Sequence, residues 1–180
     1  MPSANPSVPA AQASWQRALA QKLGLASLDR PGDDTLVADL FNLLAAVETD
    51  FTLFFRNLAA VSIEDSSPLH RAFYAEPNAE HGARVTAWLE RYLARVAEET
   101  APAAHRAQRM NSVNPKYVFR NYLAQQAIDA LAQGDATVLE RLMKVLARPY
   151  DEQPAHDELA DRRPEWARDR PGCSALSCSS

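Results

Sequence analysis

The feature that most constrains this chain is its shortage of glycine. Five glycines stand far apart in 180 residues, at positions 24, 32, 82, 134 and 172. The stretches between them are rich in Ala, Leu, Arg, Glu and Gln, which are strong helix formers. Apolar residues recur there at spacings of three and four, which places them on one face of a helix. We therefore predict an all-α protein, an irregular bundle of about six to eight helices.

Start and stop signals predict three parts: a loose arm over residues 1–12, a helical domain over 13–148 and an extended Pro-rich tail over 149–180. Caps, glycines and prolines delimit the predicted helices. These run from Ser14 to Leu23, Asp33 or Asp34 to Val47, Thr49 or Asp50 to Leu58, Ser66 to Tyr74, Glu80 to Glu99, Ala104 to Met110, Asn114 to Gly134, and Asp135 to the residue before Pro149. The helix that starts at Asn114 is predicted to be the longest. In the tail we expect no packed helix, apart from a turn near residues 156–160.

Charge and hydropathy exclude several classes of protein. The net charge is −4 with both signs interspersed, so no basic stripe favours nucleic acid. No apolar run of about 18 residues and no leader pattern is present, so we expect no membrane span and a cytoplasmic protein. The two cysteines both lie in the last eight residues, where they cannot form a disulfide framework.

The sequence offers no catalytic motif. The glycines are too dispersed for a loop that cradles phosphates, and we expect no nucleotide or metal site in this chain. The histidines are scattered without the spacing of a zinc site, and each is expected to be solvated. They are His70, His81, His105 and His156. The adjacent acids Asp33–Asp34 and Asp151–Glu152 are expected to be helix caps or solvated charges rather than a general acid/base pair.

Four segments carry a resemblance to a known family. They are NPKYVFRNYLAQQAI from Asn114 to Ile128, ARPYDEQP from Ala147, PEWA from Pro164 and the terminal SCSS. Weaker matches cover residues 15–25 and 50–56. Together they resemble the carboxy-terminal part of the selenoprotein O (SelO, also called YdiU) family of protein adenylyltransferases.

The resemblance implies a kinase-like fold that transfers AMP from ATP to Ser, Thr or Tyr hydroxyls of substrate proteins. The family's ATP and Mg²⁺ residues lie upstream of the matched segments, so this chain is expected to be the downstream helical part and to be inactive alone. Its implied partners are the missing kinase-like lobe, in cis or on another chain, and the protein substrates. A truncated reading frame, a split gene and an excised fragment all remain open as its origin.

The run from Asn114 to Ile128 holds the candidate scaffold or interface residues, which are Asn114, Lys116, Tyr117, Arg120, Asn121, Tyr122 and Gln125. Helical spacing places Tyr117, Arg120 and Asn121 on one side. One interpretation is a polar contact surface for the missing lobe. The other makes Tyr117, Phe119, Leu123 and Ile128 core residues, with Arg120 paired to an acid. Both are compatible.

Cys173 and Cys178 are the redox candidates, because an exposed thiol near Arg168 and Arg170 gains some reactivity. The alternative is a pair of inert tail thiols. The family resemblance implies a redox role for Cys178, in which it pairs with a cysteine of the catalytic lobe, whereas Cys173 is outside the family pattern.

Two further interpretations belong to other classes of protein. A free-standing helical interaction module would bind a partner through the face that a catalytic lobe normally covers. A small thiol-redox protein would need a structured cysteine of low pKa, and no thioredoxin-like βαβ pattern is present.

Overall fold

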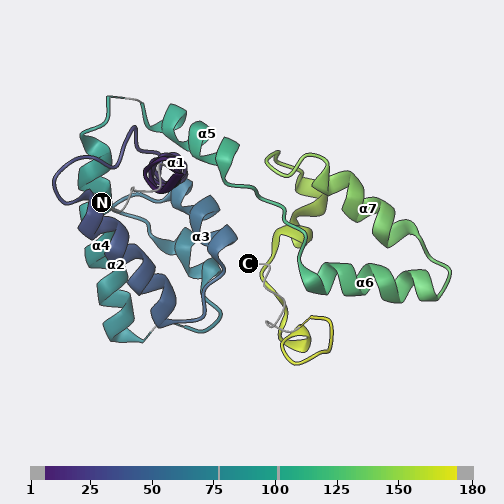
Figure 1. Ribbon diagram of the computed structural model, residues 1–180. Coiled ribbons are helices and arrows are strands. Elements are labelled where there is room, and N and C mark those ends of the chain that lie inside the picture. The colour runs from purple at the N-terminus through teal and green to yellow at the C-terminus, as the bar shows by residue number, and fades with distance from the viewer. Residues whose placement is uncertain (1–6, 77, 101, 174–180) are drawn as a thin grey trace, which may run out of the picture.

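The computed structural model describes residues 7–76, 78–100 and 102–173, and within these ranges it is all-α, as predicted. The described part holds seven α-helices and four short 3₁₀ helices, and its only β-type pairing is an isolated bridge between Thr49 and Phe73. Figure 1 shows two groups of helices joined by an extended connection. We call them the N-terminal group, residues 7–113, and the C-terminal group, residues 121–173.

The N-terminal group contains five α-helices and two 3₁₀ helices. They are α1 (Ser7–Leu23), α2 (Asp33–Ala46), α3 (Phe51–Asn57), η1 (Leu58–Ala60), η2 (Ser67–Ala72), α4 (Ala79–Ala97) and α5 (Ala103–Val113). The ends agree closely with the sequence signals, with one exception: α1 starts at Ser7, so Ser14 is internal rather than a cap, and residues 7–12 are helical rather than a loose arm. Gly24 ends α1 in the left-handed conformation at φ 70°, as predicted.

Aromatic residues fill the core of the N-terminal group. The Trp88 and Tyr92 rings of α4 stack with centroids 5.1 Å apart, and Phe54 of α3 packs against Trp88 at 6.1 Å. Their polar atoms are satisfied by backbone: Trp88 donates to the Leu36 carbonyl at 2.9 Å and Tyr92 to the Leu23 carbonyl at 2.8 Å. These bonds join α4 to α1 and α2 and leave neither the Trp88 nor the Tyr92 donor unpaired.

Two predictions about polar residues in this group are wrong. Asp33 is not a solvated cap, because Gly32 occupies the cap position and the Asp33 carboxylate is buried against Arg95 of α4 at 2.9 Å. His81 is 4% exposed rather than solvated, and its Nε2 lies 3.1 Å from the Leu43 carbonyl oxygen. Both side chains tie α4 to α2, a long-range pairing that helical periodicity does not encode.

The C-terminal group is smaller. It consists of α6 (Asn121–Ala132), α7 (Thr137–Leu146), η3 (Pro154–Ala160) and η4 (Glu165–Ala167). Its buried residues form two clusters separate from the main core: one is Tyr122, Leu123, Leu142, Ala167 and Cys173, and the other is Tyr117, Val145 and Ala160. Within the described part the hairpin of α6 and α7 packs on itself and on the segment that follows it (Figure 1).

The helix predicted from Asn114 starts seven residues later. Asn114 is extended, with φ −107° and ψ 102°, since the proline that follows excludes the helical region. Residues 114–120 form the connection between the two groups, and α6 begins at Asn121 after Arg120, which is also extended. The longest helix of the described part is therefore α4, with 19 residues.

The segment after Pro149 has no α-helix and only short 3₁₀ turns, one of them at the predicted place near residues 156–160. It is nevertheless packed rather than a free tail. Gln153, Ala160, Ala167 and Cys173 are all at least nine-tenths buried. Residues 149–173 thus form part of the C-terminal group. Among the described residues, no helix combines the length and apolar character needed to cross a membrane.

Candidate functional site

The connection between the groups carries most of the candidate residues identified in the sequence. Asn114, Lys116, Tyr117 and Arg120 lie along this extended segment, whereas Asn121, Tyr122 and Gln125 belong to the first turns of α6. The backbone amides of Lys116 and Tyr117 both donate to the Pro149 carbonyl, at 2.8 and 3.1 Å. The connection therefore lies against residues 149–153, the start of the segment predicted to be a free tail.

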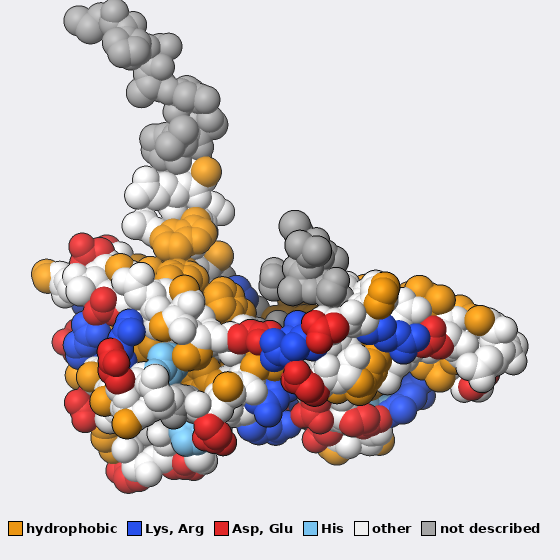
Figure 2. Space-filling view, turned by 90° about the horizontal axis from the view of Figure 1, so that it is seen from below, with side chains coloured by type: hydrophobic (Ala, Val, Ile, Leu, Met, Phe, Trp, Pro, Cys, Tyr) orange, Lys and Arg blue, Asp and Glu red, His pale blue; other side chains and the backbone are white. Residues whose placement is uncertain are grey.

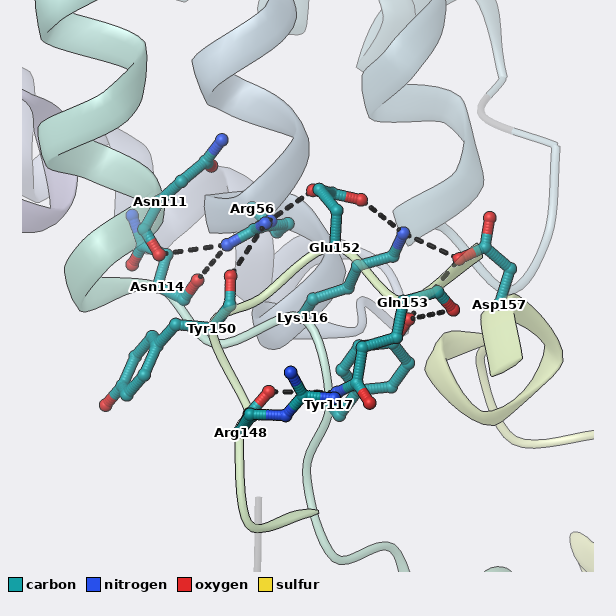
Figure 3. A network of polar contacts seen from close by, with 10 residues as sticks. All are labelled: Arg56, Asn111, Asn114, Lys116, Tyr117, Arg148, Tyr150, Glu152, Gln153 and Asp157. Atoms are coloured by element: carbon teal, nitrogen blue, oxygen red, sulfur yellow. Dashed lines mark hydrogen bonds and ion pairs between the residues drawn. The ribbon is translucent and has the colours of Figure 1, made fainter. Parts of the chain in front are cut away.

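Arg56 is the hub that holds this connection to the N-terminal group. Its guanidinium comes from α3 and is 8% exposed. It donates to the carbonyls of Asn111, Asn114 and Tyr150 at 2.9, 2.9 and 3.2 Å, and to Glu152 at 2.6 Å (Figure 3). A planar guanidinium with several fixed donors suits such a junction. One side chain thus contacts the end of α5, the connection and the segment after α7.

Lys116 continues this network on its exposed side. Its Nζ lies 2.6 Å from Glu152 and 2.7 Å from Asp157 (Figure 3). Burial alone would lower the pKa of Lys116, but hydrogen bonds to the two carboxylates outweigh that effect and raise it above its ordinary value of 10.5. In return, the Lys116 hydrogen bond lowers the pKa of both Glu152 and Asp157, and Arg56 lowers that of Glu152 further.

Tyr117 and Gln153 form the buried side of the same network. The Tyr117 hydroxyl donates to the Gln153 carbonyl at 3.0 Å, and the Gln153 side chain donates to the carbonyls of Val145 and Arg148 at 3.1 and 3.0 Å. Burial raises the pKa of Tyr117, which keeps the hydroxyl protonated as a donor. These bonds fix the end of α7 against the connection.

A second contact between the groups is the ion pair of Arg120 with Asp50. The Asp50 side chain is 3% exposed and also caps α3, accepting from the Leu53 amide at 3.0 Å. Arg120 directly precedes α6, so the pair aligns the starts of two helices from different groups. Tyr122, two residues on, donates to the Asp161 carbonyl at 3.1 Å, and burial raises its pKa to about 12.

Glu48 forms the third contact. Its two carboxylate oxygens accept from Arg163 at 2.6 Å and Arg168 at 2.9 Å. The Arg163 guanidinium also lies 5.0 Å from the centre of the Tyr74 ring. We call the three contacts, centred on Arg56, on Arg120–Asp50 and on Glu48, the charged seam. Figure 2 shows blue and red side chains alternating across the middle of the molecule, where the two groups meet.

The structure shows which residues of the run from Asn114 to Ile128 are bonded or buried within the chain. Lys116, Tyr117 and Arg120 are bonded within the chain, and Arg120 pairs with an acid as one interpretation expects. Asn114 is also internal, since its side chain exchanges hydrogen bonds with Lys22. The expected core is only half right: Tyr117 and Leu123 are buried, but Phe119 is 55% and Ile128 57% exposed.

The redox candidates differ in what the structure says of them. Cys178 lies outside the described residues. Cys173 is 3% exposed, so the prediction that it is an accessible tail thiol is wrong. Gly172, left-handed at φ 83°, and an ion pair of Arg170 with Asp129 at 2.6 Å turn the chain back onto α6, which carries Cys173 into the cluster with Tyr122 and Leu142.

No local sequence pattern marks Arg56, Asp50, Glu48 and Glu152 as residues that join the two groups. Composition gives one signal for Arg56: it is the only charged residue in α3, a helix otherwise rich in Phe and Leu. A cation on an apolar helix is costly to bury unless it is paired. Glu152 was interpreted as a solvated charge because its partner Arg56 lies 96 residues away along the chain.

The paired side chains of the seam suit it to hold the two groups together rather than to do chemistry. A general base must take up a proton near neutral pH, and the hydrogen bonds from Lys116 and Arg56 work against that because they lower the pKa of Glu152. Within residues 7–76, 78–100 and 102–173, no group of three His, Cys, Asp or Glu side chains is placed to hold a metal ion.

Comparisons with known proteins agree with the resemblance in the sequence. A family model described as protein adenylyltransferase SelO matches residues 9–147. The protein nucleotidyltransferase YdiU of Nitrosospira multiformis is 50% identical over 196 residues, which cover 93% of this chain and 35% of that protein. The corresponding proteins of Rhodopirellula baltica and Aromatoleum aromaticum are 45% and 48% identical, over 94% and 92% of this chain.

The chain spans about a third of the length of the curated relatives it matches, and the matched part is of the carboxy-terminal type. The family model covers well over half of the chain, and it includes the seam residues Glu48, Asp50, Arg56 and Arg120. The chain therefore belongs to the family of protein adenylyltransferase SelO.

Proposed function

We propose that this chain is the carboxy-terminal helical part of a SelO-type protein adenylyltransferase, an enzyme that transfers AMP from ATP to Ser, Thr or Tyr hydroxyls of proteins in the cytoplasm. The observation that carries the proposal is the family match over residues 9–147 together with about 50% identity to a protein nucleotidyltransferase. In this proposal the chain supplies scaffold, and the rest of the polypeptide supplies the nucleotide site.

The described residues of this chain do not fit a site for ATP and Mg²⁺. Such a site needs closely spaced backbone amides around the phosphates and acids that converge on the metal. Gly24, Gly32, Gly134 and Gly172 each adopt a left-handed conformation at the end of a helix or in a turn, far apart along the chain. The carboxylates of the seam are engaged with Arg and Lys.

The seam supports the role as scaffold. The three contacts of the seam are made by largely buried arginines, and an exposed ion pair of Arg71 with Asp161 at 2.8 Å joins the two groups as well. A module with such fixed geometry can present a defined surface to another part of the protein. The proposal also includes a redox role for Cys178, through a thiol of the catalytic part.

The test is a hybrid enzyme. In the YdiU protein of Nitrosospira multiformis, the region that matches this chain is replaced by this chain, and ATP labelled at its α-phosphate is supplied with Mg²⁺ and a bacterial protein extract. We expect label on protein with the hybrid and none with this chain alone. A hybrid that is folded by circular dichroism but transfers no AMP would contradict the proposal. It would favour the free-standing interaction module instead.

A further inference from the structure

The outer face of α6 is apolar and exposed, which is the reverse of what a helix on the surface of a complete protein shows. Successive residues advance by about 100°, so Ala124, Ile128 and Leu131 fall within an arc of about 60° on a helix about 18 Å long. Ile128 is 57% and Leu131 43% exposed. We call these three residues the α6 outer face.

The hydrophobic side chains there are not isolated. In Figure 2 orange side chains gather over the end of the molecule that carries α6 and α7. Phe119, two residues before α6, is 55% exposed, and Met143 of α7 is 58% exposed. Monomeric proteins rarely leave several large apolar residues of one element uncovered unless the surface binds something.

The polar residues of the same run are already used within the chain. Lys116, Tyr117 and Arg120 contact the segment after α7 or the N-terminal group, so their polar groups are already bonded within the chain. The amides and acid beside the α6 outer face are also bonded locally: Gln125 donates to Asp129 at 2.9 Å, and Asp129 pairs with Arg170. The residues of the run from Asn114 to Ile128 that are exposed for contact with a partner therefore include the apolar Phe119 and Ile128.

The length of the relatives indicates what covers this face. About two thirds of each curated relative lies outside the part that this chain matches. An interface of standard size buries about 800 Å² on each partner, with a few large apolar residues at its centre. The α6 outer face supplies two large, exposed apolar residues for such a centre, Ile128 and Leu131.

We infer that the α6 outer face is a docking surface for an apolar segment of the remaining two thirds of the SelO polypeptide. This inference rests on the proposed function for the identity of the partner. It assigns Ile128 and Leu131 to the centre of the interface and the charged seam to the interior of this chain.

The experiment measures how accessible the face is with and without the rest of the protein. A photogenerated carbene labels exposed side chains in this chain alone and in the hybrid with the Nitrosospira protein, and mass spectrometry assigns the label. In the hybrid we expect labelling of Ile128 and Leu131 to fall about five-fold, because docking would take them from about half exposed to below a tenth. Ile63, which is 62% exposed in the N-terminal group, serves as the internal control and should not change.

Two matched variants test the energetic role of the face. Ile128→Glu should leave the melting temperature of the isolated chain within a degree or so, as expected for an exposed site. In the hybrid it should restore labelling of Leu131 to the value in the isolated chain, because a buried unpaired carboxylate opposes docking. Ile63→Glu should change neither measurement.

Each result has one meaning. Equal labelling of the α6 outer face in both proteins overturns the inference, whatever the activity of the hybrid. Protection that is already present in the isolated chain and accompanies a dimer in sedimentation overturns it in favour of a second copy of this chain.

AMP transfer by the hybrid is measured separately, so an inactive hybrid with a protected α6 contradicts only the proposed function. If the hybrid does not fold, labelling of the aligned helix in the intact Nitrosospira protein decides the inference.

Discussion

Single side chains carry the connection between the two helical groups, and Arg56 carries the largest share. A buried guanidinium with four acceptors satisfies three carbonyls that no helix or sheet would otherwise pair. The energetic weight of such a residue lies less in the hydrogen bonds that it forms than in the buried groups that its removal leaves unpaired.

Replacing Arg56 by methionine should therefore destabilise the chain strongly. The apolar stem is kept, but the partly or fully buried carbonyls of Asn111, Asn114 and Tyr150 lose their donor, and we expect the free energy of unfolding to fall by about 3 kcal/mol. Urea denaturation measures the change. Arg84→Met, at an exposed arginine of α4, is the control and should stay within about 0.5 kcal/mol of the parent. Equal effects of the two substitutions would show that the Arg56 hub is dispensable.

Acid should weaken the seam through Glu152 and Asp157. Their pKa values are lowered in the folded chain from ordinary values of 4.5 and 3.8, so their contribution is present above those values and is lost as the pH falls through the lower, folded pKa values. Lys116 stays charged across this range because its pKa is raised. Lys116→Met should thus melt below the parent at pH 7, and the two melting curves should converge in acid below about pH 4. A gap that persists unchanged to the acid limit would rule out this linkage.

Burial of Cys173 should protect its thiol. In a Cys178→Ser variant, which leaves Cys173 as the one thiol of the chain, alkylation under native conditions should be roughly 100-fold slower than in urea, because the thiol must first be released from its cluster. Both rates are measured by withdrawing samples over time and determining the remaining free thiol with a chromogenic disulfide reagent. Rapid alkylation under native conditions would show that Cys173 is accessible and that residues 149–173 form the free tail predicted from the sequence.

At the scale of elements, local sequence signals predict most of the helix boundaries of the N-terminal group, but much less of the structure of the C-terminal group. The apolar stripes of α2, α4 and α7 and the glycines after α1 and α6 predict those helices to within a few residues. The predicted start of α6 is wrong, because a cap residue followed by proline is typical of a helix start, whereas the chain stays extended there to reach Arg56 and Pro149. Residues 149–173 pack through contacts such as Arg163 with Glu48, 115 residues apart, which no local pattern reveals.

Alanine substitutions at Gly82 and Gly134 should have opposite effects on stability, because only one of the two glycines has a left-handed backbone. A Cβ added at Gly82 or Gly134 meets no atom within 4 Å. Gly82 lies inside α4, so Gly82→Ala should stabilise the chain by about 0.5–1 kcal/mol. Gly134 is left-handed at φ 84°, so Gly134→Ala should destabilise it by about 1 kcal/mol. Melting temperatures should move in opposite directions by about 2–4 °C each, and a shift of the same sign for both would contradict the conformational assignment.

At the scale of the molecule, the chain is two small helical cores joined by charge rather than by a shared apolar core. The main core draws on residues 19–110, and the clusters of the C-terminal group draw on residues 117–173. The all-α class followed from composition and periodicity. The division into two groups did not, because it depends on which charged residues become buried, and that is decided by contacts between distant segments.

This architecture predicts that the seam decides whether the chain unfolds as one unit. With the seam intact we expect a single calorimetric transition, because the C-terminal group buries too few residues to be stable alone. The double variant Arg56→Met, Arg120→Met removes two of its three contacts, and two transitions should then appear. Hydrogen exchange should assign the earlier one to α6 and α7, whose amides lose protection while those of α4 keep theirs. A double variant that still melts in one step, with α6 and α4 exchanging together, would contradict this prediction, because the contacts that remain, such as Arg163 with Glu48 and Arg71 with Asp161, would then suffice to couple the groups.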